Sequence, residues 1–380
     1  MKALGAEQSG IDIMASKGKF QVIKTSPISS PAANIIKQQM LSIGGECAVA
    51  RGVANCSILK SPVILMGTCK HFNNLIEHLK YQYFGLPEIA GDIEEFFKHK
   101  QAVKIFRVGN REFYLNKRTL IMGILNVTPD SFSDGGKYSN FKQAVQAAIN
   151  MEKEGADIID VGGESSRPGA DPVSLDEELN RVIPVIQEIR KATDIPISID
   201  TYKSQVAEKA LENGANLVND ISGLMFDPEM INTIAKYDAS VAVMHIKGTP
   251  KNMQDNPGYE NIVDEILLYL KTSIEKIKGQ IGRNKILIDP GIGFGKQLKD
   301  NYLILRYLEE FKSLGYPILI GASRKSFIGN LLELSTDERL EGSIAAACCA
   351  VMNGADVLRI HDIKETVRAI KITDSIIGKS

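Results

Sequence analysis

The segment from Ile121 to Lys137 joins an apolar run to a long loop that is rich in hydrogen-bonding groups. Its first part, MGILNV, is the kind of short, continuous apolar run expected for a strand that is buried on both faces. The run leads to Asn126, and the loop 128–136 then carries three hydroxyls, two carboxylates and one aromatic ring. Connections between a strand and a helix are usually short. We therefore predict that this loop is functional rather than a solvated surface connection.

Seven further short apolar runs follow along the chain, and helical patterns separate them. The eight runs are LIMGILNV (120–127), DIIDV (157–161), PISID (196–200), LVND (217–220), SVAVMH (240–245), ILID (286–289), PILIG (317–321) and DVLRIH (356–361). Eight strands, each followed by a helix over about 260 residues, indicate an α/β protein with a (β/α)8 TIM barrel. An open doubly wound sheet is the alternative. The count of eight and the lack of a GxGxxG after the first strand disfavour it.

Almost every predicted strand ends in a side chain that can hydrogen-bond or carry charge. These residues are Asn126, Glu164, Ser165, Ser166, Arg167, Asp200, Asn219, Asp220, His245, Asp289, Ser323, Arg324, Lys325, Ser326, Arg359 and His361. A barrel of this type builds its active site from the carboxyl ends of the strands and the loops after them. Alternatively, single residues such as Asp220 or Ser174 cap the next helix. Capping does not require the lysine, arginine and histidine after the last two strands, so we predict a site here.

Asp200, Asn219 and Asp289 form an acceptor-rich group from the third, fourth and sixth strands. Two carboxylates and an amide suit a planar heterocycle with several N–H donors, because a carboxylate accepts two parallel bonds from a guanidine-like edge. A divalent metal is the competing interpretation, since carboxylates are also hard ligands. We favour the heterocycle because no histidine or third carboxylate completes an obvious metal shell.

Lys325, Arg359 and His361 form a cationic group together with the exit of the first strand. Lysine and arginine at strands seven and eight stand where barrels often hold phosphate, and arginine can bind it through two parallel hydrogen bonds. Asn126 could contribute to a Mg²⁺ shell, since Mg²⁺ keeps several waters and shares phosphate oxygens. The loop DPGIGFGK (289–296) has three glycines, which permit close approach to a flat ring.

The chain before the barrel has an α/β pattern and shows no residue pattern typical of catalysis or metal binding. Residues 1–103 are predicted to form a small accessory domain, with strands at FQVIKT, ECAVARGVA and SPVILMG and helices at SSPAANIIKQQMLSIGG, CKHFNNLIEHLKYQY and GLPEIAGDIEEFFKHK. Residues 104–119 alternate polar and apolar side chains around Gly109 and Asn110, which predicts a β-hairpin that links to the barrel at 120–380.

The composition excludes several classes of protein. The 380 residues include 45 basic and 46 acidic side chains, so no global charge attracts nucleic acid or an anionic membrane. No apolar run is long enough to cross a bilayer, and the N-terminal segment lacks the apolar centre of a signal peptide, so we expect a cytoplasmic location. The five cysteines form no CxxC pair, which favours reduced thiols over zinc ligands or disulfides.

Seven motifs between about Arg118 and the C-terminus resemble the dihydropteroate synthase family of the folate pathway. They are MGILNVTPDSFSDGG (122–136), GADIIDVGGESSRPGA (155–170), ISIDTYK (197–203), VNDISG (218–223), DPGIGFGK (289–296), GASRKSFIG (321–329) and RIHD (359–362). The resemblance implies a transferase that joins 6-hydroxymethyl-7,8-dihydropterin diphosphate to p-aminobenzoate and releases diphosphate. It does not extend over the accessory domain.

The resemblance also implies roles for individual residues. The pterin would be held by Asp200, Asn219, Asp289, Phe294 and Lys325. The diphosphate would be bound by Asn126, Arg359 and His361, with Mg²⁺ as the cofactor. The aminobenzoate pocket would contain Phe132, Asp134, Ser166, Arg167, Pro168 and Ser326, with the loop 128–136 as a lid. The catalytic residues would be Asp134, Asp289, Lys325 and Arg359. One departure from the family pattern is Ser166, where many members have threonine, so a methyl contact in this pocket is lost.

Two other functions are weighed against this one. A pterin-dependent corrinoid methyltransferase resembles this barrel but needs no diphosphate site, and both GASRKS and the TPDSFSDGG loop disfavour it. A non-catalytic pterin-binding barrel is disfavoured because Asn126, Lys325, Arg359 and His361 are all present. The resemblance further implies a homodimer with small-molecule substrates.

Overall fold

The computed structural model describes residues 1–101, 104–127 and 137–379. The chain divides into two compact units, Met1–Ala102 and Val103–Ser380, and each has a hydrophobic core of its own. Within the described residues, no helix combines the length and the apolar character that a membrane span requires.

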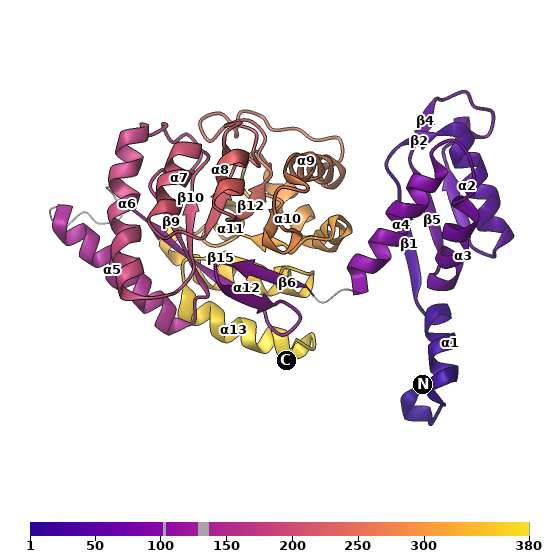
Figure 1. The fold of residues 1–380 in the computed structure, drawn as a ribbon, viewed down its shortest axis with the longest axis horizontal. Coiled ribbons are helices and arrows are strands. Elements are labelled where there is room, and N and C mark those ends of the chain that lie inside the picture. Colours follow the sequence, from indigo (N-terminus) through magenta and orange to yellow (C-terminus); the bar gives the residue numbers. More distant parts are fainter. Residues whose placement is uncertain (102–103, 128–136, 380) are drawn as a thin grey trace. The chain divides into compact units, whose positions relative to one another are not determined.

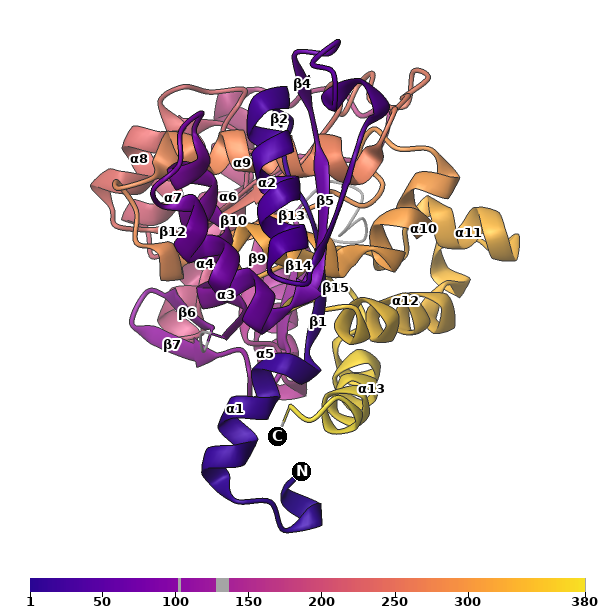
Figure 2. The same cartoon turned by 90° about the vertical axis from the view of Figure 1, so that its right-hand side faces the viewer.

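The N-terminal unit is built on a three-stranded antiparallel sheet with the order β1 (Phe20–Lys24), β5 (Val63–Thr68) and β3 (Glu46–Val49). Its other elements are α1 (Gln8–Gly18), β2 (Ile28–Ser29), α2 (Ser30–Ser42), β4 (Lys60–Ser61), α3 (Cys69–Leu79) and α4 (Leu86–Gln101). The helices α2 and α3 lie on one face of the sheet (Figure 2) and bury Leu65 of β5 completely. The other face exposes Phe20 and Val22, each to 62%.

The N-terminal unit differs from the sequence prediction in three details. The strand β3 ends at Val49, because Arg51–Val53 forms a 3-10 turn. The helix α3 ends at Leu79, and the tyrosines that follow it are exposed. The helix α1 was not predicted: none of its residues is buried, and its sequence contains two glycines and no apolar stripe. Periodicity therefore gives no signal for α1.

The second unit is a closed parallel barrel, which confirms the predicted fold class (Figure 1). Its strands are β8 (Leu120–Asn126), β9 (Ile158–Gly162), β10 (Ile197–Asp200), β11 (Leu217–Asp220), β12 (Ser240–Met244), β13 (Ile286–Asp289), β14 (Leu319–Ile320) and β15 (Val357–Ile360). Neighbouring strands pair in the order β13-β12-β11-β10-β9-β8-β15-β14, and a parallel bridge between Ile288 and Ile318 joins the two ends.

Helices surround the barrel strands as an outer ring (Figure 1). They are α5 (Lys137–Glu154), α6 (Leu175–Ala192), α7 (Ser204–Glu212), α8 (Met230–Lys236), α9 (Ile262–Ile277), α10 (Leu298–Arg306), α11 (Ser326–Leu332), α12 (Leu340–Met352) and α13 (Ile363–Ile376). Apolar residues at every second strand position, such as Ile159, Val161 and Ile199, are fully buried in the core cluster that these helices share.

The alternate strand positions face the barrel interior, and their chemistry changes with height. The lower positions are apolar and pack together: Met122, Ile158, Leu217, Leu287, Leu319 and Val357 belong to one buried cluster. Two residues further along, the same strand faces carry Asp160, Asn219, Asp289 and Arg359. Because side chains alternate between the two faces of a strand, each polar residue stands directly above an apolar one. The barrel interior is therefore apolar near the amino ends of the strands, which form its floor, and polar and charged near their carboxyl ends, which form its mouth.

A β-hairpin closes the bottom of the barrel. Its strands are β6 (Ile105–Val108) and β7 (Arg111–Tyr114), in the segment predicted to form a hairpin. Phe106 is fully buried and packs with Val108 and Leu115 in the same cluster as the apolar strand residues at the barrel floor. Polar contacts fasten the hairpin as well: the Lys104 Nζ lies 2.9 Å from the Asp356 Oδ2. The hairpin is thus a structural part of the barrel unit.

Phe106→Ala is expected to lower the free energy of unfolding of the barrel unit by roughly 3–5 kcal/mol, because it leaves a cavity in a closed core. Urea unfolding followed by circular dichroism measures this loss. Tyr114→Ala, in the same hairpin, is the matched control, since Tyr114 is 47% exposed. Equal losses in both variants would show that the hairpin is not part of the barrel core.

Candidate active site

Four side chains from four strands form a connected ion-pair network at the barrel mouth. The Arg359 Nε donates to the Asp160 Oδ2 at 2.6 Å, and the Arg359 Nη2 donates to the Asp200 Oδ2 at 2.7 Å. The Asn219 Nδ2 donates to the same Asp160 oxygen at 3.2 Å. Asp160 is fully buried and Asn219 is 4% exposed. The sequence-derived acceptor and cationic groups are therefore one cluster, with Arg359 in contact with Asp200.

Lys325 and Asp289 extend this cluster along the loop 289–296. The Asp289 Oδ1 accepts the backbone N–H of Gly291 at 2.7 Å, which fixes the carboxylate at the start of the loop. The Lys325 Nζ donates to the carbonyl oxygen of Ile292 and lies 4.5 Å from the centroid of the Phe294 ring. Gly293 has φ +84°, and a Cβ atom there would lie 3.0 Å from the Lys325 Cδ. A glycine at 293 thus lets the lysine stem lie against the loop.

Burial moves the pKa values of Asp200 and Lys325 toward neutral pH. Burial raises the pKa of Asp200 to about 7, although the charge of Arg359 works in the opposite direction. Burial lowers the pKa of Lys325 to about 8, although the carboxylate of Asp289 works in the opposite direction. Burial also raises the pKa of Asp289. Perturbed titratable groups gathered in one concave place are typical of a functional site.

His361 differs from its sequence-based assignment to the cationic group. Burial, together with the charge of Arg359, lowers its pKa to about 4, so the imidazole is neutral at pH 7. The Ser323 Oγ lies 3.0 Å from the His361 Nδ1 and accepts the His361 backbone N–H at 3.3 Å. The hydroxyl can donate to Nδ1 or accept from it, so this contact holds the ring in either tautomer. In the tautomer with its proton on Nε2, His361 gives a ligand a hydrogen bond, and in neither neutral form does it add a positive charge.

Asn126 ends β8 near the carboxylate of Asp200. A Cβ atom placed on Gly162 would lie 3.7 Å from both the Asn126 Oδ1 and the Asp200 Oδ2, so these two oxygens face the same small volume. The described residues contain no group of three His, Cys, Asp or Glu side chains able to hold a metal ion. One amide oxygen with a nearby carboxylate fits a Mg²⁺ ion that arrives with substrate phosphates and keeps several waters.

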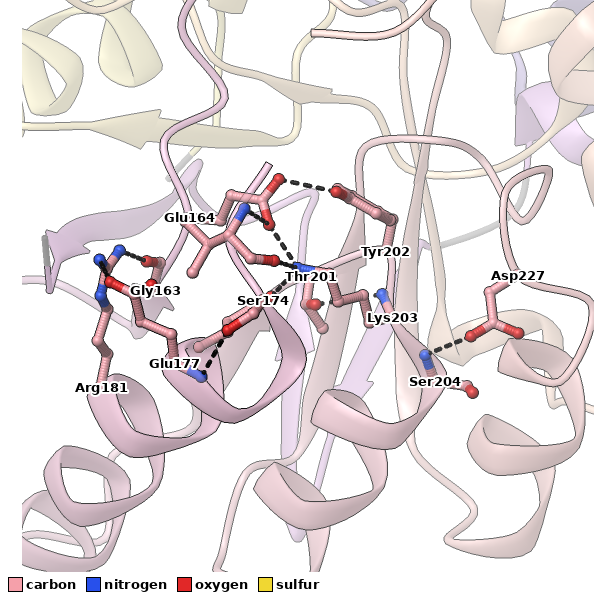
Figure 3. Close-up of polar contacts among 12 residues, drawn as sticks. Gly163, Glu164, Ser174, Glu177, Arg181, Thr201, Tyr202, Lys203, Ser204 and Asp227 are labelled. Carbon is pink, nitrogen blue, oxygen red and sulfur yellow. Dashed lines mark hydrogen bonds and ion pairs between the residues drawn. The ribbon is translucent and has the colours of Figure 1, made fainter. Parts of the chain in front are cut away.

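The loop between β9 and α6 carries Ser166, Arg167 and Pro168, and ion pairs hold its base (Figure 3). Glu164, at the start of the loop, accepts the Tyr202 hydroxyl at 2.8 Å and the Lys203 Nζ at 2.5 Å. Ser166 is half-buried, whereas Arg167 and Pro168 are exposed. Ser166 and Asp200 both line a cavity of about 10 Å³, so this loop lies next to the carboxylate cluster.

The remaining candidate residues divide into three sets. Phe132 and Asp134 lie outside the described residues. Ser326 is exposed at the start of α11, directly after Lys325. Ser174 caps the next helix, as the alternative interpretation held: its Oγ accepts the Glu177 N–H at 3.3 Å. Asp220 does not cap α8, which begins at Met230; its carboxylate accepts the N–H groups of Ser222 and Leu224 at 2.8 and 3.0 Å and so holds the turn after β11.

Reasoning from the sequence missed Asp160, Glu178, Lys203 and Lys296 as parts of the site. Asp160 has a recognisable signal, because it is an acid within the apolar run DIIDV on the inward-facing side of the strand. Lys296 is 3% exposed and donates to the His245 Nδ1 and to the Phe294 carbonyl oxygen, each at 2.9 Å. It joins the loop 289–296 to the end of β12. His245, which burial brings to a pKa of about 2, is therefore a neutral packing partner.

Comparison with known proteins shows which family this chain resembles. The model of the family described as "Pterin binding enzyme" matches residues 122–361. A dihydropteroate synthase of Clostridium beijerinckii is 48% identical over 275 residues, which are 72% of this chain and 100% of the relative. A crystal structure of dihydropteroate synthase from Clostridium difficile in the presence of pteroic acid is 50% identical, with a TM-score of 0.66, and covers 70% of this chain and 98% of that chain.

A further relative is similar to the N-terminal unit as well. A probable bifunctional folylpolyglutamate synthase/dihydropteroate synthase of Halobacterium salinarum is 39% identical over 374 residues, which are 96% of this chain and 44% of the relative. Since the barrel unit begins at Val103, a match of this extent includes most of the N-terminal unit. The similarity to this relative therefore extends over most of the N-terminal unit.

The fold, the carboxylate cluster and these similarities define the class: the chain belongs to the family of pterin-binding enzymes. Within that family, its activity is that of a dihydropteroate synthase. It is a transferase that condenses 6-hydroxymethyl-7,8-dihydropterin diphosphate with p-aminobenzoate to give 7,8-dihydropteroate and diphosphate. The corrinoid methyltransferase and the non-catalytic barrel find no support in these relatives.

Proposed function

We propose that this condensation takes place at the mouth of the barrel, on the cluster of Asp160, Asp200, Asn219, Asp289, Lys325 and Arg359. The observation that carries the proposal is the pairing of Asp200 with Arg359, whose side chains are 10% and 16% exposed. A carboxylate held by an arginine keeps one oxygen free to accept N–H groups from a heterocycle edge.

In this proposal the pterin edge lies against Asp200, Asn219 and Asp289. These side chains are acceptors or carry an amide that can both donate and accept, which matches a ring edge with amino, N–H and carbonyl groups. Lys325 donates to a ring acceptor, and Phe294, under its ammonium group, offers a flat apolar surface to the ring. The relative solved with pteroic acid, a pterin joined to aminobenzoate, supports a binding site of this chemistry.

The diphosphate lies toward Asn126, Arg359 and His361, with Mg²⁺ as the cofactor. Bound Mg²⁺ supplies neutralisation of the charge that develops on the leaving diphosphate. Arg359 adds a permanent positive charge: although burial works to lower its pKa, Asp160 and Asp200 hold that pKa above its ordinary value. His361 adds an N–H donor without charge. Preorganised donors of this kind stabilise charge that appears only in the transition state.

The aminobenzoate pocket is assigned to the loop with Ser166, Arg167 and Pro168 and to Phe132, Asp134 and Ser326. The C–O bond between the pterin methylene and the diphosphate breaks, and its electron pair leaves with the diphosphate. The amine nitrogen then forms the new C–N bond and loses one proton to water. Asp289, beside the pterin, and Asp134 stabilise positive charge at the methylene carbon, so no strong base is needed.

The test is diphosphate release by the purified full-length protein. With the pterin diphosphate and Mg²⁺ present, release is expected only when p-aminobenzoate is added. Chelation of Mg²⁺ with EDTA is expected to slow release at least about 100-fold, because metal stabilisation of a leaving group contributes several kcal/mol. Added Mg²⁺ restores the rate and serves as the control. Release at the same rate without p-aminobenzoate, or indifference to EDTA, would contradict the proposal.

The quaternary state and the location are separate proposals. We propose a homodimer because barrels that resemble this one tend to pair, and sedimentation velocity with the full chain tests this directly. A cytoplasmic location also stays a proposal, which rests on the absence of a long apolar run in the sequence.

A further inference from the structure

Lys203, at the start of α7, has three partners for its three N–H bonds. Its Nζ lies 2.5 Å from the Glu164 Oε2, 2.5 Å from the Glu178 Oε2 and 2.8 Å from the carbonyl oxygen of Val173. The Lys203 side chain is 20% exposed, that of Glu164 is 11% exposed and that of Glu178 is 1% exposed. An ammonium group with three oxygen partners has no donor left for a substrate.

The partners of Lys203 stand at both ends of one loop. Glu164 is the second residue after β9, and Val173 lies directly before Ser174, the N-cap of α6. The Glu164 Oε2 also accepts the Val173 backbone N–H at 3.3 Å, so the two ends of the loop touch each other as well as Lys203. A loop whose ends are this close together forms one compact unit. Between its two ends this loop carries Ser166, Arg167 and Pro168.

A second contact links this loop base to the pterin side of the site. Tyr202 precedes Lys203, and Figure 3 shows its hydroxyl directed at Glu164, with an oxygen–oxygen distance of 2.8 Å. Asp200 ends β10 only two residues before Tyr202. Glu164, Ser166, Glu178, Asp200 and Tyr202 all line the cavity of about 10 Å³, a space the size of one water molecule. Movement of the loop base therefore changes the wall between the two substrate positions.

The charge of Lys203 compensates the charges of Glu164 and Glu178. Burial raises the pKa of Glu178, and its Oε1 has no hydrogen-bond partner among the described residues. The pKa of Lys203 is raised by Glu164 and Glu178 even though burial works to lower it, so the ammonium charge is retained. Without that charge, two carboxylates would face each other with little solvent between them. Buried ion pairs that lose one partner leave an uncompensated charge, which moves the structure around it.

We propose that Lys203 is a positioning residue for the aminobenzoate substrate: by joining Glu164, Glu178 and Val173 it holds the base of the loop 164–173, so that Ser166, Arg167 and Pro168 face the pterin. This inference rests on the proposed assignment of these three residues to the aminobenzoate pocket. It concerns binding of the second substrate and assigns Lys203 no contact with either substrate.

The central experiment measures the two substrates separately in Lys203→Met. The KM for p-aminobenzoate is expected to rise about 10- to 100-fold, because small misplacement of a binding group costs that much. The Kd of the pterin diphosphate, measured by calorimetry without aminobenzoate, and kcat at saturating aminobenzoate are expected to stay within about threefold of the unaltered protein, a change of less than 1 kcal/mol. A general loss of structure would change all three quantities together. Lys209→Met, on the same helix and paired with exposed Glu212, is the matched control and is expected to change none of them.

Two further variants keep the test decisive if Lys203→Met folds poorly. Glu164→Gln keeps the side-chain shape and weakens one ion pair, so a smaller rise in the same KM is expected. Lys203→Arg keeps the charge and can still bridge two carboxylates, so most of the loss should be recovered. An unchanged aminobenzoate KM in both Lys203→Met and Glu164→Gln, or an equal change in the Kd of the pterin, overturns the inference.

Arg167→Ala separates this inference from the proposed function. If Arg167→Ala raises the aminobenzoate KM and Lys203→Met does not, the pocket assignment stands and the role of Lys203 is wrong. If neither variant changes that KM, the assignment of the loop to aminobenzoate is wrong, and the inference falls with it.

Discussion

Asp200→Ala is expected to abolish turnover while leaving the far-ultraviolet circular dichroism spectrum unchanged. The change removes the carboxylate oxygen that is free to accept N–H groups of the pterin edge. That oxygen can accept two hydrogen bonds, and two bonds to a charged group, at about 1.5–3 kcal/mol each, correspond to a loss in kcat/KM of about 10²- to 10⁴-fold. The fold should persist because Arg359 keeps its bond to Asp160 and because Asp200 stands at the end of its strand.

Two variants sharpen the Asp200 experiment. Asp200→Asn keeps the shape and one acceptor oxygen, so its kcat/KM should lie between those of the unaltered protein and Asp200→Ala. Asp92→Ala, an exposed carboxylate on α4 of the N-terminal unit, is the control and should leave both rate and spectrum unchanged. A rate near that of the unaltered protein in Asp200→Ala would refute the proposed pterin site.

Lys325→Ala is expected to lower kcat/KM at least about 100-fold, since loss of one preorganised donor in a closed site typically has that effect. The pH profile gives a second measurement. Burial lowers the pKa of Lys325 to about 8, so the ammonium form is present below that pH and is lost as the pH rises through it. The kcat/KM for the pterin diphosphate should therefore fall above about pH 8.

Lys325→Arg tests whether this alkaline limb belongs to Lys325. Arginine stays charged throughout the range, because its pKa lies above about 12, so whatever activity the variant retains should show no fall near pH 8. Lys299→Ala, an exposed lysine on α10, is the control and should keep the limb in place. An unchanged alkaline limb in Lys325→Arg would assign it to another group.

Much of the fold and site was readable in the sequence because strand patterns are local. The four residues ILID predict a buried strand that ends at Asp289. Because active sites of barrels form at the carboxyl ends of the strands, the sequence also places Asp200, Asn219 and Lys325 in this site. The hairpin at 104–119 was readable for the same reason. Its place beneath the barrel was not, since burial of Phe106 depends on residues of seven strands that come later in the chain. A truncation that begins at Arg111 would remove β6 and open that floor.

The pairing of charges was beyond the reach of sequence patterns. Arg359 and Asp160 are 199 residues apart, and Lys203 meets Glu164 and Glu178 at separations of 39 and 25 residues. Reading only the strand exits left out Asp160, which stands two residues below the exit of β9. From the sequence, we grouped His361 with the cations because a histidine side chain can carry a positive charge. Only burial beside Arg359 lowers its pKa enough to make it neutral.

By itself, the sequence determined the eight βα units, the strand exits and the resemblance of seven motifs to a family of known chemistry, because each depends on residues close together in the chain. The tertiary structure alone decided which exits share a charge network, which loop base Lys203 holds and which groups lose water. The physical reason is that pairing and desolvation depend on distances in space between strands that the chain order leaves far apart, and those distances exist only once the barrel has closed.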